Sequence, residues 1–192
     1  MEKQSHKRIF TAATFLGDLG YLLVRFPRII GALLNRDISA ALREKLMLVT
    51  TAINECGYCS WFHARQAVAS GVSEEEVASM LNLQFQADAS SFELNALLYA
   101  QHFAETNRNP DAEMTARLFD YYGDKTAKHI IVLIRMIFFG NLFGNTWDAV
   151  LNRFKGKPNE DSSVIFEYVF FLLFFWFMWI AVLLTKKKEG AL

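Results

Sequence analysis

Apolar residues recur at helical spacing along most of the chain, and no segment alternates polar and apolar residues as a β-strand would. Between residues 8 and 155 the pattern predicts helices almost throughout. The segment 40–53 illustrates it, because its apolar residues form one stripe: Leu42, Leu46, Val49 and Ile53. Ser39 is a suitable N-cap for this helix and Asn54 a natural stop. The sequence therefore predicts an all-α fold.

Further boundary signals follow along the same region. Gly71 is a natural left-handed residue at the end of a helix, and Ser73 with Glu76 forms a capping box that starts the next one. Ser90 and Glu93 repeat the capping-box signature. Pro110 then opens another helical segment.

The apolar stretch from Ile130 to Phe143 is interrupted by Arg135 and is too short to cross a bilayer. It is also too apolar to face water, so we expect it in a core or a subunit interface.

Residues 164–185 differ from every earlier segment. They carry no charge from Tyr168 to Thr185, with Glu167 near one end. A buried core helix would keep a polar face, and this one keeps none. About 21 residues at about 1.5 Å each match a hydrocarbon core of about 30 Å, which predicts one C-terminal transmembrane helix. The predicted organisation is a helical domain (1–155), a linker (156–163), the span (164–185) and a basic tail (186–192).

Charge adds little to this organisation. Lysine plus arginine and aspartate plus glutamate both total 20, so no basic surplus indicates a nucleic-acid partner. Asp18 interrupts the apolar run near the N-terminus and no clear cleavage site follows, so we predict no signal peptide and a cytoplasmic domain. Basic residues flank both ends of the span equally, and the positive-inside rule leaves its orientation open.

Both cysteines of the chain lie three positions apart, at Cys56 and Cys59, and His63 follows four positions later. On a helix these three residues fall within roughly 60° of arc, and so share one face. Glu44 lies ten residues before Asn54 and His63 nine after it, so the two side chains can face each other if the helices run antiparallel. The result is a carboxylate–imidazole–thiol relay, an arrangement that activates a thiol nucleophile.

Three interpretations of the cysteines stand side by side. In a reducing compartment this spacing suggests catalysis or a metal rather than a structural staple. Cys56, Cys59, His63 and Glu44 could together ligate zinc, although adjacent helices rarely bring four ligands to within about 2 Å of one point. The cysteines could also be two small buried residues. We favour the redox dithiol, with no metal and no cofactor, and the positive end of the helix would lower the pKa of the Cys56 thiol.

Other polar residues are assigned to packing. His102 and His129 have no acidic or thiol partner at helical spacing, and Asn141, Asn145 and Asp148 are interpreted as packing residues rather than as part of a pocket.

The spacing Glu44-x11-Cys56-x2-Cys59-x3-His63, flanked by ALREKLMLVTTAINECGYC and HARQAVASGVSEEEV, resembles the alkylhydroperoxidase D and carboxymuconolactone decarboxylase superfamily over about residues 25–155. The resemblance implies an all-helical trimer or hexamer that reduces peroxides or exchanges disulfides. It also implies that Cys59 attacks the peroxide, that Cys56 resolves the product, and that Glu44 and His63 relay protons. The position of His63 favours the same nucleophile. One departure is Tyr58, where the well-studied peroxidase has a histidine.

Together these features predict a membrane-anchored thiol-dependent peroxidase or thiol–disulfide oxidoreductase. Its expected partners are a peroxide or disulfide substrate, a thiol electron donor and the lipid bilayer. A trimer is favoured over a hexamer, because two opposed layers could not insert every tail into one membrane. The alternative is a non-catalytic subunit of a larger membrane complex, held there by its tail.

Overall fold

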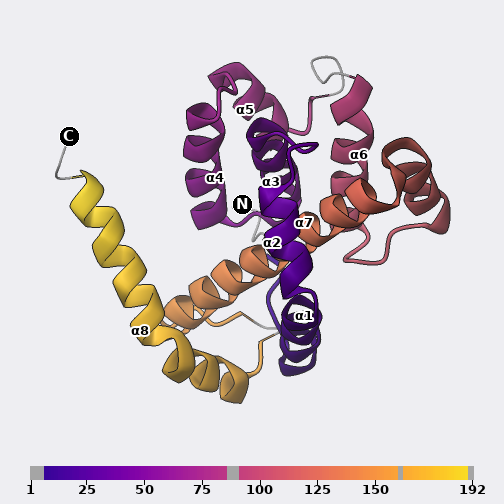
Figure 1. Cartoon of the computed structure of the whole chain (residues 1–192). Helices are drawn as coiled ribbons and strands as arrows, with labels where there is room; N and C mark the ends of the chain where they lie inside the picture. The colour runs from indigo at the N-terminus through magenta and orange to yellow at the C-terminus, as the bar shows by residue number, and fades with distance from the viewer. Residues whose placement is uncertain (1–6, 86–90, 160–161, 190–192) are drawn as a thin grey trace.

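The computed structural model describes residues 7–85, 91–159 and 162–189. Within these ranges every regular element is an α-helix, which confirms the all-α prediction (Figure 1). The helices in chain order are α1 (Ala12–Val24), α2 (Phe26–Leu34), α3 (Ala40–Asn54), α4 (Gly57–Ala69), α5 (Glu74–Leu81), α6 (Ser91–Glu105), α7 (Ala112–Phe154) and α8 (Val164–Glu189).

Helix α3 is the centre of the body, and it packs against α4, α5, α6 and α7 (Figure 1). The backbone N–H of Leu42 donates to the Ser39 hydroxyl across 3.0 Å, which confirms the predicted N-cap. Helix α3 ends at Asn54 as predicted, because Glu55 adopts a left-handed conformation with φ of 54°. Its predicted stripe points into the core, with Leu42, Leu46 and Val49 buried.

The predicted signals between α4 and α5 are also confirmed. Gly71 has φ of 91°, and the N–H of Val72 donates to the carbonyl of Ala67 across 3.0 Å, as in a Schellman motif. Ser73 and Glu76 form the reciprocal capping box that starts α5. The second predicted capping box cannot be compared, because Ser90 lies outside the described residues.

Helix α7 is long, and it bends at Gly123, whose φ of 72° and ψ of 164° are not helical. Its apolar stretch is buried in the core as predicted, at Ile130, Val132, Leu133, Ile134, Ile137, Phe138 and Leu142. By length and composition α7 is the one helix among the described residues that could cross a membrane, but 67% of its apolar window is buried inside the protein. Burial of that kind is typical of the core helix of a compact domain.

Helix α8 includes all residues of the predicted span. Its first turns pack against the helical domain. Phe170 is buried among the aromatic residues of α1 and α7. The described apolar part, Val164–Trp176, is about 20 Å long and by itself shorter than a bilayer. The transmembrane span of residues 164–185 therefore stays a prediction.

Candidate functional site

The two cysteines lie at the junction between α3 and α4. Cys56 is the N-cap of α4, and its sulfur accepts a hydrogen bond from the Cys59 backbone N–H across 3.4 Å. Cys56 was expected in the first turn of this helix, and it lies instead one position before that turn. Helix α4 can begin here because the left-handed Glu55 reverses the chain directly after α3.

Cys56 and Cys59 are joined by a disulfide, with their Cα atoms 5.3 Å apart. The two sulfurs differ in access to solvent. Cys56 is fully buried, at 0% exposed, whereas Cys59 is partly exposed at the edge of the core. A reactant arriving from outside therefore meets Cys59 first.

Glu44 and His63 meet across α3 and α4 as predicted. The carboxylate oxygen Oε2 of Glu44 lies 2.7 Å from Nδ1 of His63, and both side chains are largely shielded from solvent. Because the carboxylate accepts, Nδ1 carries the proton and Nε2 is left to take up or release one. His63 follows Cys59 by one helical turn on α4, and the ring of Phe62 packs edge-on against its imidazole, with 5.1 Å between the centroids.

Buried amides from α7 hold the turn that carries the cysteines. Asn141 accepts a hydrogen bond from the Asn54 side chain across 3.2 Å and donates to the Thr51 hydroxyl across 2.9 Å. Asn145 donates to the backbone carbonyl of Asn54 across 2.7 Å. The packing role given to these asparagines from the sequence was therefore incomplete, because their amides fix the end of α3 directly before Cys56.

Arg8 supports the same turn from the N-terminal segment. Its guanidinium donates to the Asn54 side-chain oxygen and to the Glu105 carbonyl, across 3.2 Å each, and also to the Ala104 carbonyl. Burial and the neighbouring Arg108 lower the pKa of Arg8, while Glu105 opposes them. Residues far apart in the sequence thus converge on Asn54.

Gly144 is a site residue that the sequence interpretation missed. A Cβ at this position would lie 2.8 Å from the Cys56 sulfur and 3.8 Å from the Cys59 sulfur. Only glycine lets α7 approach the disulfide this closely. The available signal was the repeated Gly-Asn pair in GNLFGN, which places Gly140 with Asn141 and Gly144 with Asn145 one helical turn apart.

Tyr58 stands between the cysteines and is about half exposed. Burial raises the pKa of Tyr58, and the charge and hydrogen bond of Asp148 raise it further. Asp148 in turn lies 3.4 Å from the ammonium of Lys7. The Tyr58 hydroxyl therefore stays protonated at neutral pH and donates its hydrogen bond to Asp148.

The other described histidines lie outside the site. His102 does have an acidic neighbour, because its Nε2 lies 3.3 Å from the Asp111 carboxylate at the start of α7. His129 is buried and contacts the Asn35 amide through Nδ1 at 3.0 Å, and burial lowers its pKa. Within the described part of the chain, no group of three or more His, Cys, Asp or Glu residues is arranged to hold a metal ion.

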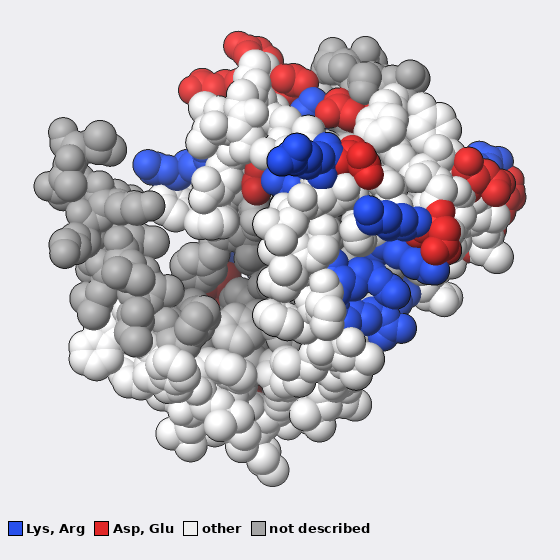
Figure 2. Space-filling view, viewed as in Figure 1, with Lys and Arg blue, Asp and Glu red and all other residues white. Residues whose placement is uncertain are grey.

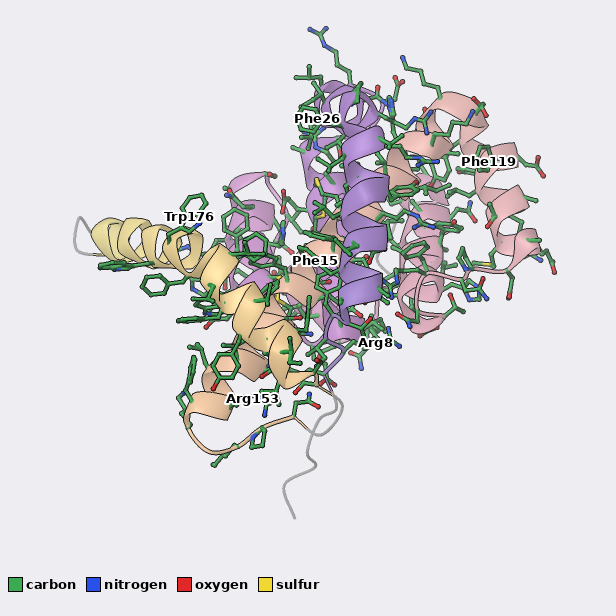
Figure 3. All side chains as sticks on the ribbon, turned by 90° about the horizontal axis from the view of Figure 1, so that it is seen from below. Arg8, Phe15, Phe26, Phe119, Arg153 and Trp176 are labelled. Carbon is green, nitrogen blue, oxygen red and sulfur yellow. A yellow bond between two sulfur atoms is a disulfide. The ribbon has the colours of Figure 1, made fainter. Side chains whose placement is uncertain are left out.

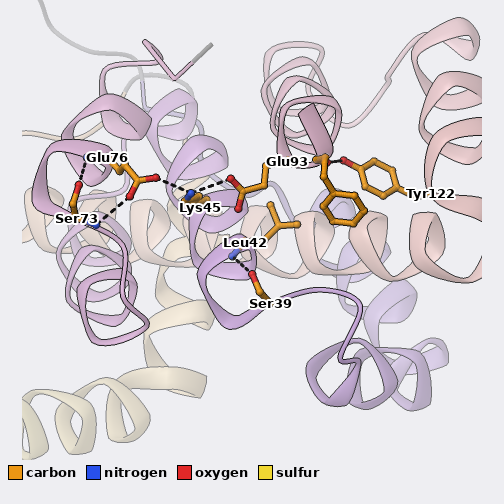
Figure 4. Close-up of polar contacts among 8 residues, drawn as sticks. Ser39, Leu42, Lys45, Ser73, Glu76, Glu93 and Tyr122 are labelled. Carbon is orange, nitrogen blue, oxygen red and sulfur yellow. Dashed lines mark hydrogen bonds and ion pairs between the residues drawn. The ribbon is translucent and has the colours of Figure 1, made fainter. Parts of the chain in front are cut away.

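An ion-pair cluster around the buried Lys45 fixes α3 next to Glu44. The ammonium of Lys45 lies 2.9 Å from Glu76 on α5 and 3.0 Å from Glu93 on α6 (Figure 4). Burial lowers the pKa of Lys45, but the two carboxylates outweigh it, so the pKa is raised overall. The hydrogen bond from Lys45 lowers the pKa of Glu76. These ion pairs link α3, α5 and α6 at the residue next to Glu44.

The model of the carboxymuconolactone decarboxylase family matches residues 22–102. The match supports the resemblance to the alkylhydroperoxidase D-like superfamily, and it includes Glu44, Cys56, Cys59 and His63. It leaves out α7 and α8, and with them Asn141, Asn145 and Gly144. No curated protein and no solved structure matches the chain.

Proposed function

We propose that this protein is a membrane-anchored thiol-dependent peroxidase or thiol–disulfide oxidoreductase, in which Cys56 and Cys59 cycle between dithiol and disulfide. One observation carries the proposal. The partly exposed Cys59 is bonded to a fully buried Cys56 and lies one helical turn from a histidine held by a carboxylate at 2.7 Å. The family of the matched region includes decarboxylases as well as peroxidases, and a dithiol beside a proton relay favours the redox branch.

The oxidising half of the cycle needs only Cys56, Cys59, His63 and the hydroperoxide itself. His63 Nε2 accepts the Cys59 proton, and the thiolate attacks the terminal oxygen of a hydroperoxide. A sulfur–oxygen bond forms and the oxygen–oxygen bond breaks, while the leaving alkoxide takes the proton from His63. Cys56 then attacks the Cys59 sulfenic acid, so the disulfide forms and hydroxide leaves with the Cys56 proton as water.

The reducing half needs an external dithiol. Its thiolate attacks Cys59, the more accessible sulfur, and Cys56 leaves as a thiolate. The second thiol of the donor then releases Cys59, so the donor becomes a disulfide and the protein a dithiol. Glu44 keeps His63 oriented through both halves. A disulfide substrate would use the same steps in either direction.

Helix α8 supplies the proposed anchor. Its described outward residues are strongly exposed and apolar, with Ile165 and Leu172 among them. Such residues are stabilised in contact with acyl chains rather than water. Retention of the full chain in carbonate-washed membranes would support the anchor, and its release into the wash would contradict it. The homotrimer or hexamer implied by the resemblance remains a prediction.

A thiol titration tests the redox proposal. The reduced protein, purified in mild detergent, should lose both free thiols after one equivalent of peroxide, and the peptide that carries both cysteines should lose two hydrogens by mass. A dithiol donor should then restore both thiols. The Cys59→Ser variant is the control and should not react. Thiols that survive peroxide, in a protein that purifies with other membrane subunits, would instead favour the non-catalytic alternative.

A further inference from the structure

The surface of the molecule is divided between a charged part and an apolar part. In Figure 2 the charged side chains gather over the upper and right-hand parts of the view, while the lower part, where α1 and the start of α8 lie in Figure 1, is almost free of them. The strongly exposed apolar residues of these two helices are Leu16, Leu23, Val24, Ile165, Leu172 and Leu173. Soluble proteins rarely expose a large contiguous apolar surface, so such a surface indicates a partner or a membrane.

Helices α1, α7 and α8 form one packed unit beneath this surface. The ring of Phe15 on α1 lies 5.9 Å from Phe170 and 5.8 Å from Phe174, measured between centroids. Phe143 on α7 lies 4.8 Å from Phe170, which is only 1% exposed. Figure 3 shows Phe15 where α1 crosses α8. The first half of α8 therefore cannot be moved away from α1 without opening an aromatic core.

The length of α8 links this packing to the membrane. Residues 175–185, which follow the packed part, would extend only about 16 Å, roughly half of a hydrocarbon core of about 30 Å. A complete span must therefore include the segment from Phe166 to Phe174, which is about 12 Å long. Whatever packs against that segment lies at the depth of one leaflet.

We propose that α1 is embedded in the same leaflet as the first half of α8 and contacts acyl chains through Leu16, Leu23 and Val24. This inference rests on the anchor in the proposed function and goes beyond it, because the helical body itself enters the bilayer. Helix α1 is about 20 Å long, too short to cross, so it lies within the leaflet.

The charges near this surface fit a lipid neighbour. The charged residue within α1 is Asp18, which pairs with Arg108 and is largely shielded. Arg25 and the exposed Arg28 follow directly after α1, at the end where lipid headgroups rather than acyl chains would meet them. At the start of α8, Glu167 is buried and pairs with Arg153. Both carboxylates therefore face protein rather than the apolar surface, as a bilayer requires. A second copy of the chain would not need this pairing, because an interface can include charged pairs of its own.

Spin labels on the full chain test the inference. Cys56→Ser and Cys59→Ser first remove the native thiols, and serine is a preferred N-cap, so the start of α4 is retained. Leu16→Cys then carries the label on α1, and Leu172→Cys reports on the anchor. Glu113→Cys is the control, because its side chain is 75% exposed and lies on the first segment of α7, far from α8 in Figures 1 and 3. Each variant is reconstituted into phosphatidylcholine vesicles after circular dichroism confirms its helical content.

The readout compares collisions with oxygen, which dissolves in acyl chains, and with a water-soluble nickel chelate. Labels at 16 and 172 should collide more with oxygen, and the label at 113 more with nickel. A label at 16 that prefers nickel, while 172 prefers oxygen, overturns the inference and leaves the anchor intact. A label at 16 shielded from both, with dipolar broadening between labels, shows that a second copy covers α1 and also overturns it. If both labels, at 16 and at 172, collide more with nickel, the result contradicts the membrane anchor as well as the position of α1.

Discussion

Gly144→Ala tests the contact between α7 and the disulfide. Gly144 lies in the interior of α7 with helical backbone angles, so alanine would ordinarily favour this position by about 1 kcal/mol. The new Cβ, however, would lie 2.8 Å from the Cys56 sulfur. Contacts between non-bonded heavy atoms are best at about 3.5–4.0 Å, so α7 or the disulfide has to move by about 1 Å.

The size of the effect follows from these two terms. Overpacking of a well-packed core costs about 1–3 kcal/mol, which offsets or exceeds the gain in helix propensity. Gly140→Ala is the matched control, because it lies one turn earlier on α7 and its Cβ would meet only Ile137, at 4.0 Å. Gly140→Ala should stabilise the protein, and Gly144→Ala should be less stable than it by about 1–3 kcal/mol.

Thermal unfolding in one detergent compares the two variants. For a chain of this length, 1 kcal/mol shifts the melting temperature by about 2–4 °C, so Gly144→Ala should melt roughly 2–12 °C below Gly140→Ala. In a Cys56→Ser background Gly144→Ala should cost much less, because the smaller oxygen leaves room for the Cβ, and the two changes should therefore be non-additive. Equal melting temperatures for the two alanine variants would refute the close approach of α7 to Cys56.

Three further predictions concern the site and its support. Cys59→Ser should abolish peroxide reactivity, whereas Cys56→Ser should leave a sulfenic acid on Cys59 that mass spectrometry detects; the reverse pattern would exchange their roles. His63→Gln should slow thiol oxidation by about 10²- to 10⁴-fold in stopped-flow assays, and an unchanged rate would remove it from the relay. Lys45→Met should cost about 1–3 kcal/mol in urea unfolding, because it leaves the partly buried carboxylates of Glu76 and Glu93 without their cation, whereas the exposed control Lys128→Met should cost less than about 1 kcal/mol. Equal losses in the two lysine variants would contradict the assigned burial.

The same cluster gives a pH dependence whose sign follows from its pKa shifts. The pKa of Glu76 is lowered in the folded protein, so its contribution is present above the usual carboxyl pKa and is lost as the pH falls through the lowered value. The pKa of Lys45 is raised, so its contribution is complete below the usual lysine pKa and is lost as the pH rises through the raised value. Stability should therefore decline at both extremes, and Lys45→Met should flatten both limbs.

Local signals in the sequence predicted the helix boundaries and one contact of the candidate site. The Ser39 cap, the Gly71 stop and the capping box at Ser73 depend on residues within one turn of each other, so sequence alone can identify them. The contact between Glu44 and His63 was also predictable, because one tight turn relates two neighbouring helices. Long-range partners were not. Asn141 and Gly144 contact the turn from about 90 residues away, and no local pattern specifies which helix crosses there.

Two physical arguments favour different cysteines as the nucleophile. The helix-dipole argument favours Cys56, because the N-terminus of a helix stabilises a thiolate. In the structure Cys56 is the N-cap of α4, but it is fully buried under Gly144, and a buried thiol meets no substrate. Cys59 gains less from the helix end, yet it is partly exposed and lies one turn from His63. Access and the proton relay therefore support the proposal that Cys59 is the attacking thiol, and the helix end instead favours Cys56 as the thiolate that would leave when the disulfide is reduced.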